Sequence, residues 1–224
     1  MIYYSSPNIA KPMTIGHLRA TIIGNSLYKI YSFLGYKCVG INFLGDYGTQ
    51  FGKLLVAYKK WGIKKEVEDN PIPALLNLYR KFTLEAEGNP KIEEDARLEF
   101  KKLEKGDKEN VGLWKRFRQL SIDEFEKFYN ILGVKFDVYS GESVYSKSAS
   151  EVIQKMKQSK IAIESHGALI VNLEKYNLPP LLIQKSDGST MYSSRDIAAV
   201  MDRYKKYKFD KMLYVVASEQ NAYF

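Results

Sequence analysis

The chain has 224 residues and a mass of 25.8 kDa, which fits one large domain or one domain that carries an insertion. Its composition, 45% hydrophobic and 27% charged, is that of a globular protein whose core needs no disulfide or metal staple. The single cysteine, Cys38, excludes an internal disulfide framework, and two histidines speak against a His-rich metal site. No apolar run approaches the ~18 residues of a membrane span and no secretion signal opens the chain, so we expect a cytoplasmic protein that contacts no membrane.

Positive charge is concentrated at the start of the chain. Lys and Arg number 34 against 26 Asp and Glu, and the first 60 residues contain seven of the cations but a single acid, Asp46. A basic segment suits a phosphate-bearing partner, either a nucleotide or a nucleic acid. A solvated basic face is the alternative explanation of the same charges.

The first 60 residues alternate between strand and helix patterns. A short apolar opening ends in Ser-Ser-Pro-Asn, which is typical of a buried strand that runs into a turn. Apolar residues then recur at the helical period and mark one face of a helix, which Gly35 ends. This alternation predicts a βαβ unit and therefore a parallel sheet. The expected elements are a strand over 1–5, a helix over 16–34, a strand over 38–44 and a helix over 51–60.

Residues 62–185 break the alternation and predict an insertion. Three charged helical stretches come first, and Ser148 with Glu151 fits a capping box that opens a further helix. Short strands follow, which we expect to be antiparallel, with turns at His166-Gly167 and Asp187-Gly188.

The alternation resumes with a helix over about 194–207 and a strand over 211–216. The predicted fold is α/β, a Rossmann-like doubly wound parallel sheet with an inserted α+β connective domain. We therefore divide the chain into the first half of a nucleotide-binding core, the insertion, and the start of the second half of the core. The three parts cover 1–61, 62–185 and 186–224.

The segment from Ser5 to Leu18 carries residues suited to phosphate chemistry. A strand end and a turn with two prolines lead into the N-terminus of a helix, whose unpaired N–H groups attract phosphate. Gly16 lets a flat base approach the backbone, His17 is able to donate a hydrogen bond to a phosphate oxygen, and Lys11 adds a mobile cation. A capping or solvated histidine is the structural alternative for His17.

Several motifs resemble one family. The stretch from Pro7 to His17 resembles the first signature of class I aminoacyl-tRNA synthetases, whose common form is His-Ile-Gly-His. Residues 5–24 are similar to arginyl-tRNA synthetases in particular, and further motifs follow in the order expected for that family. They are Gly-Asp-Tyr-Gly-Thr-Gln-Phe-Gly at 45–52, Lys-Ser-Asp-Gly-Ser at 185–189, Tyr-Ser-Ser-Arg-Asp at 192–196 and Ser-Glu-Gln at 218–220.

The resemblance implies two sets of binding residues. Asn8 would hold the α-amino or carboxylate end of an arginine substrate, and Tyr192 and Asp196, which share a helix face, would recognise its guanidinium. The arginine set is Ser6, Asn8, Tyr192, Asp196 and Gln220. The ATP set is Pro7, Lys11, Thr14, Gly16, His17 and Glu219, of which Lys11, Thr14, Gly16 and His17 would support catalysis.

Some of these residues have structural alternatives. Asp196 suits the first turn of a helix, Tyr192 an ordinary core position, and Gln220 a polar loop. Asp46 and Gln50 are candidates either for capping the following helix or for the site.

Four departures from the family pattern affect these expectations. Thr14 replaces the first histidine of His-Ile-Gly-His and cannot carry charge, so we expect weaker phosphate contact there, compensated by Lys11 and His17. Tyr3 stands where an acid that contributes to guanidinium recognition is common, and Ala217 stands where glycine is usual. The second class signature, a Lys-Met-Ser-Lys-like loop, is absent, which predicts a catalytic core cut at both ends.

The implied function is that of an arginine–tRNA ligase. ATP with Mg²⁺ would activate L-arginine, and tRNA(Arg) would receive the arginyl group, without a protein nucleophile or a tightly bound protein-ligated metal. Trp114, Lys115, Arg116 and Arg118 are candidates either for facing the acceptor stem or for the wet side of packed helices. We expect a monomer and an inactive isolated fragment. Two alternatives stay open, another class I adenylylating enzyme with a different amino acid and a non-catalytic module that binds tRNA or nucleotide.

Overall fold

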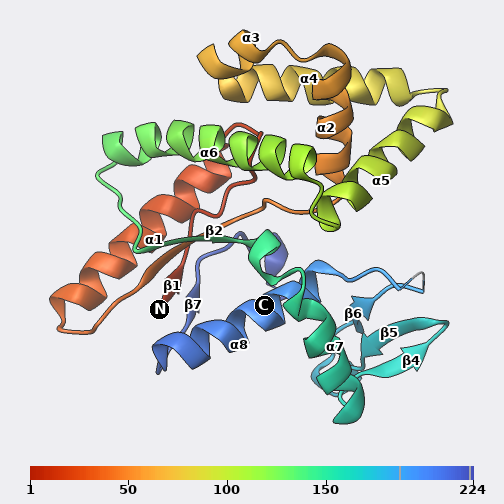
Figure 1. Ribbon diagram of the computed structural model, residues 1–224. Helices are drawn as coiled ribbons and strands as arrows, with labels where there is room; N and C mark the ends of the chain where they lie inside the picture. Colours follow the sequence, from red (N-terminus) through yellow and green to blue (C-terminus); the bar gives the residue numbers. More distant parts are fainter. Residues whose placement is uncertain (187, 222) are drawn as a thin grey trace.

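A parallel sheet forms the centre of the molecule. The computed structural model describes residues 1–186, 188–221 and 223–224 (Figure 1). The sheet has the strand order β3-β2-β1-β7, and all its pairings are parallel. The predicted α/β class and parallel sheet are confirmed. The four strands are β1 (Ile2–Tyr3), β2 (Gly40–Leu44), β3 (Val138–Gly141) and β7 (Leu213–Tyr214).

The sheet is covered on both faces, as the predicted doubly wound fold requires. On one face, Tyr4 and Leu44 pack in a core with Phe117 of α6 (Lys108–Ile131). On the other face, Ile41 packs with Ala198 of α8 (Tyr192–Tyr207) and with residues of α7 (Ser148–Gln158). Figure 1 shows α1 (Ile15–Phe33) and α6 on one side of the strands and α7 and α8 on the other.

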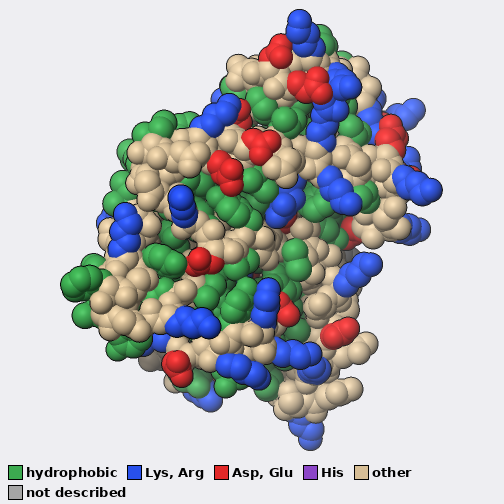
Figure 2. All heavy atoms as spheres, turned by 60° about the vertical axis from the view of Figure 1, so that its left-hand side comes forward, with side chains coloured by type: hydrophobic (Ala, Val, Ile, Leu, Met, Phe, Trp, Pro, Cys, Tyr) green, Lys and Arg blue, Asp and Glu red, His purple; other side chains and the backbone are tan. Residues whose placement is uncertain are grey.

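Helix α1 approaches the sheet through small residues. Only Thr21 and Gly24 of α1 are buried, and a Cβ on Gly24 would lie 2.2 Å from the Cβ of Tyr4. The predicted apolar face is therefore only partly covered, and Ile30 is 54% exposed. Figure 2 shows hydrophobic side chains at the surface of this side of the molecule, interspersed with Lys and Arg. In the part of the chain that the structure describes, no helix has both the length and the apolar character needed to cross a membrane.

A block of helices follows β2. The sequence predicts three helical stretches after residue 62, whereas the structure has four before β3, because the first is a short separate helix. The block consists of α2 (Thr49–Trp61), α3 (Lys64–Asp69), α4 (Pro71–Ala86), α5 (Pro90–Glu104) and α6.

Strand β3 departs from the sequence-based expectation. It lies within residues 62–185, which we assigned to the insertion, yet it pairs with β2 as an edge of the main sheet. The division of the chain into three parts stays a prediction, with β3 as a core strand inside the middle part.

A small antiparallel sheet follows α7, as predicted. It contains β4 (Ile163–Ser165), β5 (Ala168–Val171) and β6 (Leu181–Gln184). The predicted turn at His166 and Gly167 joins β4 to β5, and both residues have positive φ, 49° and 77°. Asp187, part of the second predicted turn, lies outside the described residues. Helix α7 begins at Ser148 as expected, but no side chain caps it, so the predicted capping box does not form.

Candidate active site

A cavity of about 380 Å³ lies at the carboxyl ends of β1 and β7. The strand order reverses between these two strands, because β2 lies on one side of β1 and β7 on the other. Open α/β sheets bind ligands at such a reversal point. A larger cavity of about 570 Å³ lies between the start of β1 and the segment Lys206–Lys211, and none of the predicted site residues line it.

Most of the predicted site residues meet in the smaller cavity. The predicted residues that line it are Ser6, Asn8, Thr14, Gly16, His17, Tyr192, Asp196 and Gln220. Three others do not: Pro7 is buried, Glu219 is exposed outside the lining, and Lys11 places its Nζ 5.8 Å from the ring centre of Tyr79. The structure therefore brings the arginine set together completely and the ATP set in part.

The turn after β1 is held in an unusual conformation. Ser5 and Ser6 have φ values of 67° and 50°, a left-handed conformation that costs free energy for residues other than glycine. Tertiary hydrogen bonds hold it, because Ser5 Oγ lies 2.8 Å from Tyr129 Oη of α6 and the Ala10 N–H donates to Ser121 Oγ at 2.9 Å. The turn thereby carries Ser6 and Asn8 to the cavity.

Asn8 is packed against Gly45, the residue that follows β2. The Gly45 N–H donates to the carbonyl of Pro7, and the Ile9 N–H donates to the carbonyl of Gly45. A Cβ on Gly45 would lie 2.0 Å from Asn8 Oδ1, so only glycine leaves room for the amide. The Gly-Asp-Tyr-Gly motif thus supports the position of Asn8.

The start of α1 forms another wall of the cavity. Thr14 is its N-cap residue, and the Thr14 N–H donates to His17 Nδ1 at 3.0 Å. The hydroxyl of Thr14 lies 2.8 Å from the same nitrogen. Burial lowers the pKa of His17 below its usual value.

Tyr192 and Asp196 lie at the start of α8 and share the cavity. Asp196 lies beyond the first turn of α8, so it is not a first-turn acid of that helix. Tyr192 is 48% exposed, so it is not an ordinary core residue. Tyr223 donates its hydroxyl hydrogen to Asp196 Oδ2 at 2.5 Å, and its ring centre lies 4.9 Å from that of Tyr192. Burial raises the pKa of Asp196, while the Tyr223 hydrogen bond and the nearby Arg203 and Arg195 partly offset this effect.

Glu142 is a cavity residue that the sequence reasoning missed. It follows β3, and its Oε2 accepts from Arg195 Nε at 3.0 Å and lies 2.9 Å from Arg195 Nη2. Burial raises its pKa, and the charge and hydrogen bond of Arg195 oppose this rise. Glu142 directly follows β3. If residues 138–141 had been predicted as a strand of the main sheet, Glu142 would have been expected at the carboxyl edge of the sheet, where the cavity lies.

Tyr3 occupies the wall where the family pattern suggests an acid. The guanidinium of Arg203 lies 5.6 Å from the ring centre of Tyr3 and 4.8 Å from that of Phe43. Burial raises the pKa of Tyr3 to about 12, so the hydroxyl is neutral at physiological pH.

Among the described residues, no group of three or more His, Cys, Asp or Glu is arranged to hold a metal ion.

Asp46 is an anchor between elements. Its side chain is fully buried and accepts from Arg118 Nε at 2.9 Å, from the Ser143 N–H at 2.9 Å and from Ser143 Oγ at 3.0 Å. It does not cap α2, whose N-cap residue is Gly48. Gln50 does not cap α2 either. It lines a separate small pocket together with Lys11 and Tyr79.

The basic residues of α6 are largely used inside the molecule. Trp114 donates its indole N–H to the Asp46 carbonyl at 2.8 Å, Arg118 pairs with the Asp46 carboxylate, and Arg116 pairs with Glu68. Lys115 is exposed. Three of the four residues considered for contact with an acceptor stem therefore have internal partners.

Comparisons with known proteins identify the family of the chain. The family model described as tRNA synthetases class I (R), catalytic domain, matches residues 1–224. Relatives named arginine–tRNA ligase include those of Alkaliphilus metalliredigens, 56% identical over all of this chain and 39% of the relative, and Clostridioides difficile, 55% identical over all of this chain and 40% of the relative. The chain thus spans about 40% of the length of the curated relatives it matches.

A solved structure supports the same relationship. The crystal structure of arginyl-tRNA synthetase from Plasmodium falciparum superposes with a TM-score of 0.82 at 33% identity, over all of this chain and 38% of that chain. The Thermus thermophilus arginyl-tRNA synthetase shares the fold, with a TM-score of 0.67 at 22% identity over 91% of this chain and 35% of that chain. The family match over the whole chain places this protein among the class I tRNA synthetases (R), as a member of their catalytic-domain family.

Proposed function

We propose that this chain is the catalytic core of an arginine–tRNA ligase, which activates L-arginine with ATP and transfers it to tRNA(Arg). The observation that carries the proposal is the meeting of Asn8, His17, Tyr192 and Asp196 in one cavity at the strand reversal point. Relatives that are 56% and 55% identical bear that name. The proposed reaction needs the segments that those longer relatives also contain.

Arginine recognition is assigned to the carboxylate side of the cavity. Asp196 would bind the guanidinium in the place where the Tyr223 hydroxyl now donates its hydrogen bond. Tyr192 would pack beside it, and Asn8, supported by Ser6 and Gln220, would hold the α-amino or carboxylate end. Glu142 adds a second carboxylate to the same wall, although its Oε2 is already paired with Arg195.

ATP is assigned to the helix side of the cavity. The first N–H groups of α1 have no partners within the helix and favour phosphate, and Gly16 leaves space for the nucleotide. His17 would donate to a phosphate oxygen, with Thr14 beside it. Lys11, Pro7 and Glu219 belong to this proposal only if ATP draws their segments inward, because they lie outside the cavity lining. Mg²⁺ would arrive with ATP.

The reaction follows from positioning. The arginine carboxylate would attack the α-phosphate, forming arginyl-adenylate and releasing pyrophosphate, and a ribose hydroxyl at the 3′ end of the tRNA would then attack the activated carbonyl and release AMP. Both steps use substrate groups as nucleophiles, so the protein contributes orientation and stabilisation of phosphate charge. We further propose that the protein works as a monomer in the cytoplasm.

A chimera tests the proposal directly. The matching residues of the Alkaliphilus metalliredigens relative are replaced by this chain, which is 56% identical to them, and the product is assayed for charging of tRNA(Arg) with labelled arginine. We expect arginyl-tRNA to form, and we expect Asp196→Ala in the same chimera to abolish it. A folded chimera that charges tRNA with another amino acid, or with none, would overturn the proposal. The isolated chain is expected to be inactive in the same assay.

A further inference from the structure

The imidazole of His17 is held by one neighbouring residue. Its Nδ1 lies 3.0 Å from the backbone nitrogen of Thr14 and 2.8 Å from the Thr14 hydroxyl. The backbone of His17 is fixed as well, because Thr21 donates its hydroxyl hydrogen to the His17 carbonyl at 2.7 Å. Both Thr14 and His17 line the cavity, so this contact defines how the ring meets a ligand.

The backbone contact decides which ring nitrogen carries the proton. A hydroxyl is able to donate or accept, so Thr14 Oγ1 is satisfied by either tautomer of the imidazole. A backbone N–H only donates, so the Thr14 N–H needs a lone pair on Nδ1. The neutral ring therefore keeps its proton on Nε2, the nitrogen that remains free to donate to a ligand.

The same contact opposes protonation of the ring. An imidazolium carries a hydrogen on Nδ1, which would point at the Thr14 N–H. Burial acts in the same direction. The titratable groups that share the cavity with His17 are Tyr3, Glu142, Tyr192, Asp196 and Tyr223. Among the described residues, none of them forms a hydrogen bond or ion pair with the ring that would favour the charged form.

We infer that Thr14 is a positioning residue, which holds His17 as the neutral tautomer with Nε2–H as the donor for an anionic oxygen of the ligand. On the proposed function, that oxygen belongs to the triphosphate of ATP, and this part of the inference rests on that proposal. Thr14 thus acts through His17, whereas the sequence suggests a weak direct contact with phosphate. The ring therefore takes up a second proton only at a lower pH than an ordinary histidine does.

Nuclear magnetic resonance tests the tautomer without requiring any activity. The chain has two histidines, so ¹⁵N-histidine labelling gives two spin systems, and His166→Gln assigns them. His166 is exposed in the β4–β5 turn, away from the cavity. We expect His17 to show the Nε2–H pattern and to titrate below the ordinary histidine pKa of 6.5. An Nδ1–H pattern, or a titration at or above that ordinary value, would overturn the inference.

Two variants test the role of the Thr14 side chain. Thr14→Val keeps the backbone N–H and the shape but removes the hydroxyl, which either tautomer satisfies, so we expect His17 to keep the Nε2–H pattern. Thr14→Ser keeps both groups and should give the same pattern. A change of tautomer in Thr14→Val would overturn the inference, because the hydroxyl and not the backbone N–H would then set the tautomer.

Kinetics of the chimera link the contact to the reaction. In arginine-dependent exchange of pyrophosphate into ATP, we expect the rate to depend on histidine protonation only below the ordinary histidine pKa of 6.5, because burial lowers the pKa of His17. Thr14→Val should lower kcat by ~10-fold, less than the loss of a whole transition-state donor, and leave the KM for arginine unchanged. A wild-type rate that falls at or above the ordinary histidine pKa would overturn the inference while arginylation itself, and with it the proposed function, still stands.

Discussion

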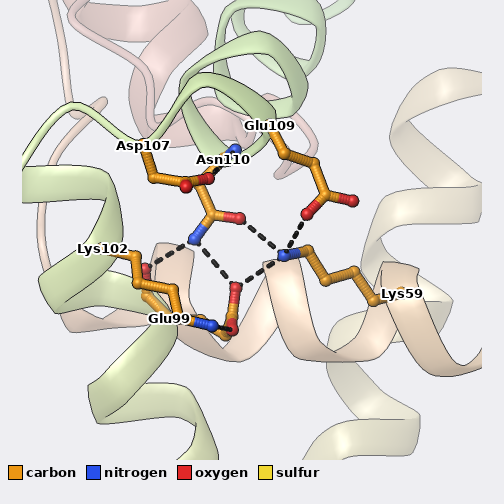
Figure 3. Close-up of polar contacts among 6 residues, drawn as sticks. All are labelled: Lys59, Glu99, Lys102, Asp107, Glu109 and Asn110. Carbon is orange, nitrogen blue, oxygen red and sulfur yellow. Dashed lines mark hydrogen bonds and ion pairs between the residues drawn. The ribbon is translucent and has the colours of Figure 1, made fainter.

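Two polar regions of this molecule use charge in opposite ways. Between α2, α5 and α6, Lys59 Nζ contacts Glu99 Oε2 at 2.7 Å, Glu109 Oε2 at 2.9 Å and Asn110 Oδ1 at 2.7 Å (Figure 3). Burial favours a raised pKa for Glu99, but hydrogen bonds from Lys102, Lys59 and Asn110 outweigh it and bring the pKa to about 2. This network is satisfied by the chain itself.

The cavity at the strand reversal leaves its carboxylates less satisfied. Asp196 and Glu142 face the same space, and burial raises the pKa of both despite the nearby arginines. The Lys59–Glu99–Asn110 network therefore holds helices together, whereas the cavity keeps carboxylates at a free-energy cost that a cationic ligand would relieve. The two regions therefore differ in whether hydrogen bonds and ion pairs within the chain outweigh the cost of burying a carboxylate: they do at Glu99 and do not at Asp196.

The largest expected effect is on arginine binding. Asp196→Asn keeps the shape of the side chain but removes its charge, so we expect the affinity of the chimera for arginine to fall about 100-fold, or about 2.7 kcal/mol. The free energy of unfolding should not fall, because the buried charge is disfavoured in the folded state. Calorimetric titration with arginine, with and without an ATP analogue, measures the first effect, and thermal unfolding measures the second.

Glu99→Gln is the matched control for this carboxylate. It removes a charge from the Lys59–Glu99–Asn110 network, so it should leave arginine affinity unchanged. Equal losses of affinity in the two variants would break the distinction between the regions.

The next effect concerns stability. Asn110 is fully buried, accepts from Lys59 and donates to the Glu99 carbonyl at 2.9 Å and to Glu99 Oε2 at 2.8 Å. Asn110→Ala removes one partner from Lys59 and one from Glu99 and leaves a gap where a fully buried side chain stood, so we expect the free energy of unfolding to fall by about 2 kcal/mol in urea denaturation. Arginine affinity should be retained.

Gln119→Ala is the control for this amide. Gln119 donates to Asp123 at 2.7 Å on the exposed side of α6. Its loss should change the free energy of unfolding by less than ~0.5 kcal/mol. A cost similar to that of Asn110→Ala would show that the buried network has no special role.

Whether a feature of the fold could be predicted from the sequence depends on how far apart its interacting residues lie along the chain. The βαβ unit and the hairpin at His166 are local patterns, and the structure has both. The role of Asp46 was not predictable, because its partners Arg118 and Ser143 are 72 and 97 residues away. Glu142 was missed for a related reason, since β3 joins the sheet only after the intervening helical block.

The motifs bring most of the predicted residues to one cavity. Asn8 follows β1, His17 lies in the first turn of α1 and Asp196 lies in α8, and all three line that cavity. The motif predicts Lys11 in the ATP set, but its flexible side chain packs over Tyr79 and does not line the cavity. The partial exposure of α1 was also not predictable, since periodicity identifies an apolar face and says nothing about what covers it.

A smaller effect is expected from Gly45, which supports Asn8. Gly45→Ala would place a Cβ 2.0 Å from Asn8 Oδ1 and force the amide to move, so we expect arginine affinity to fall by about tenfold, or about 1.4 kcal/mol. Calorimetric titration of the chimera measures this change. Gly112→Ala in α6, where no atom lies within 4 Å of the added Cβ, should leave affinity unchanged. Unaltered binding in Gly45→Ala would remove Asn8 from the arginine site.

The smallest expected effect, about 1 kcal/mol, is in the pH dependence of stability. The folded pKa of Glu99 is about 2 and lies below its ordinary value of 4.5, so its contribution is present above about pH 4.5 and is lost as the pH falls towards 2. Urea midpoints of wild type and Glu99→Gln should therefore differ most near pH 6 and converge in acid.

The carboxyl groups of the cavity should give the opposite slope. The folded pKa of Asp196 is raised, so the folded state binds its proton more tightly, and stability falls as the pH rises from the unfolded pKa through the folded one. Asp196→Asn should accordingly gain stability relative to wild type as the pH rises, while Glu99→Gln loses it. Because each variant replaces one carboxylate with its amide, the sign of the slope separates a charge that the fold satisfies from one that it leaves for a ligand. Parallel slopes would mean that the cavity carboxylate is as well satisfied as the structural one.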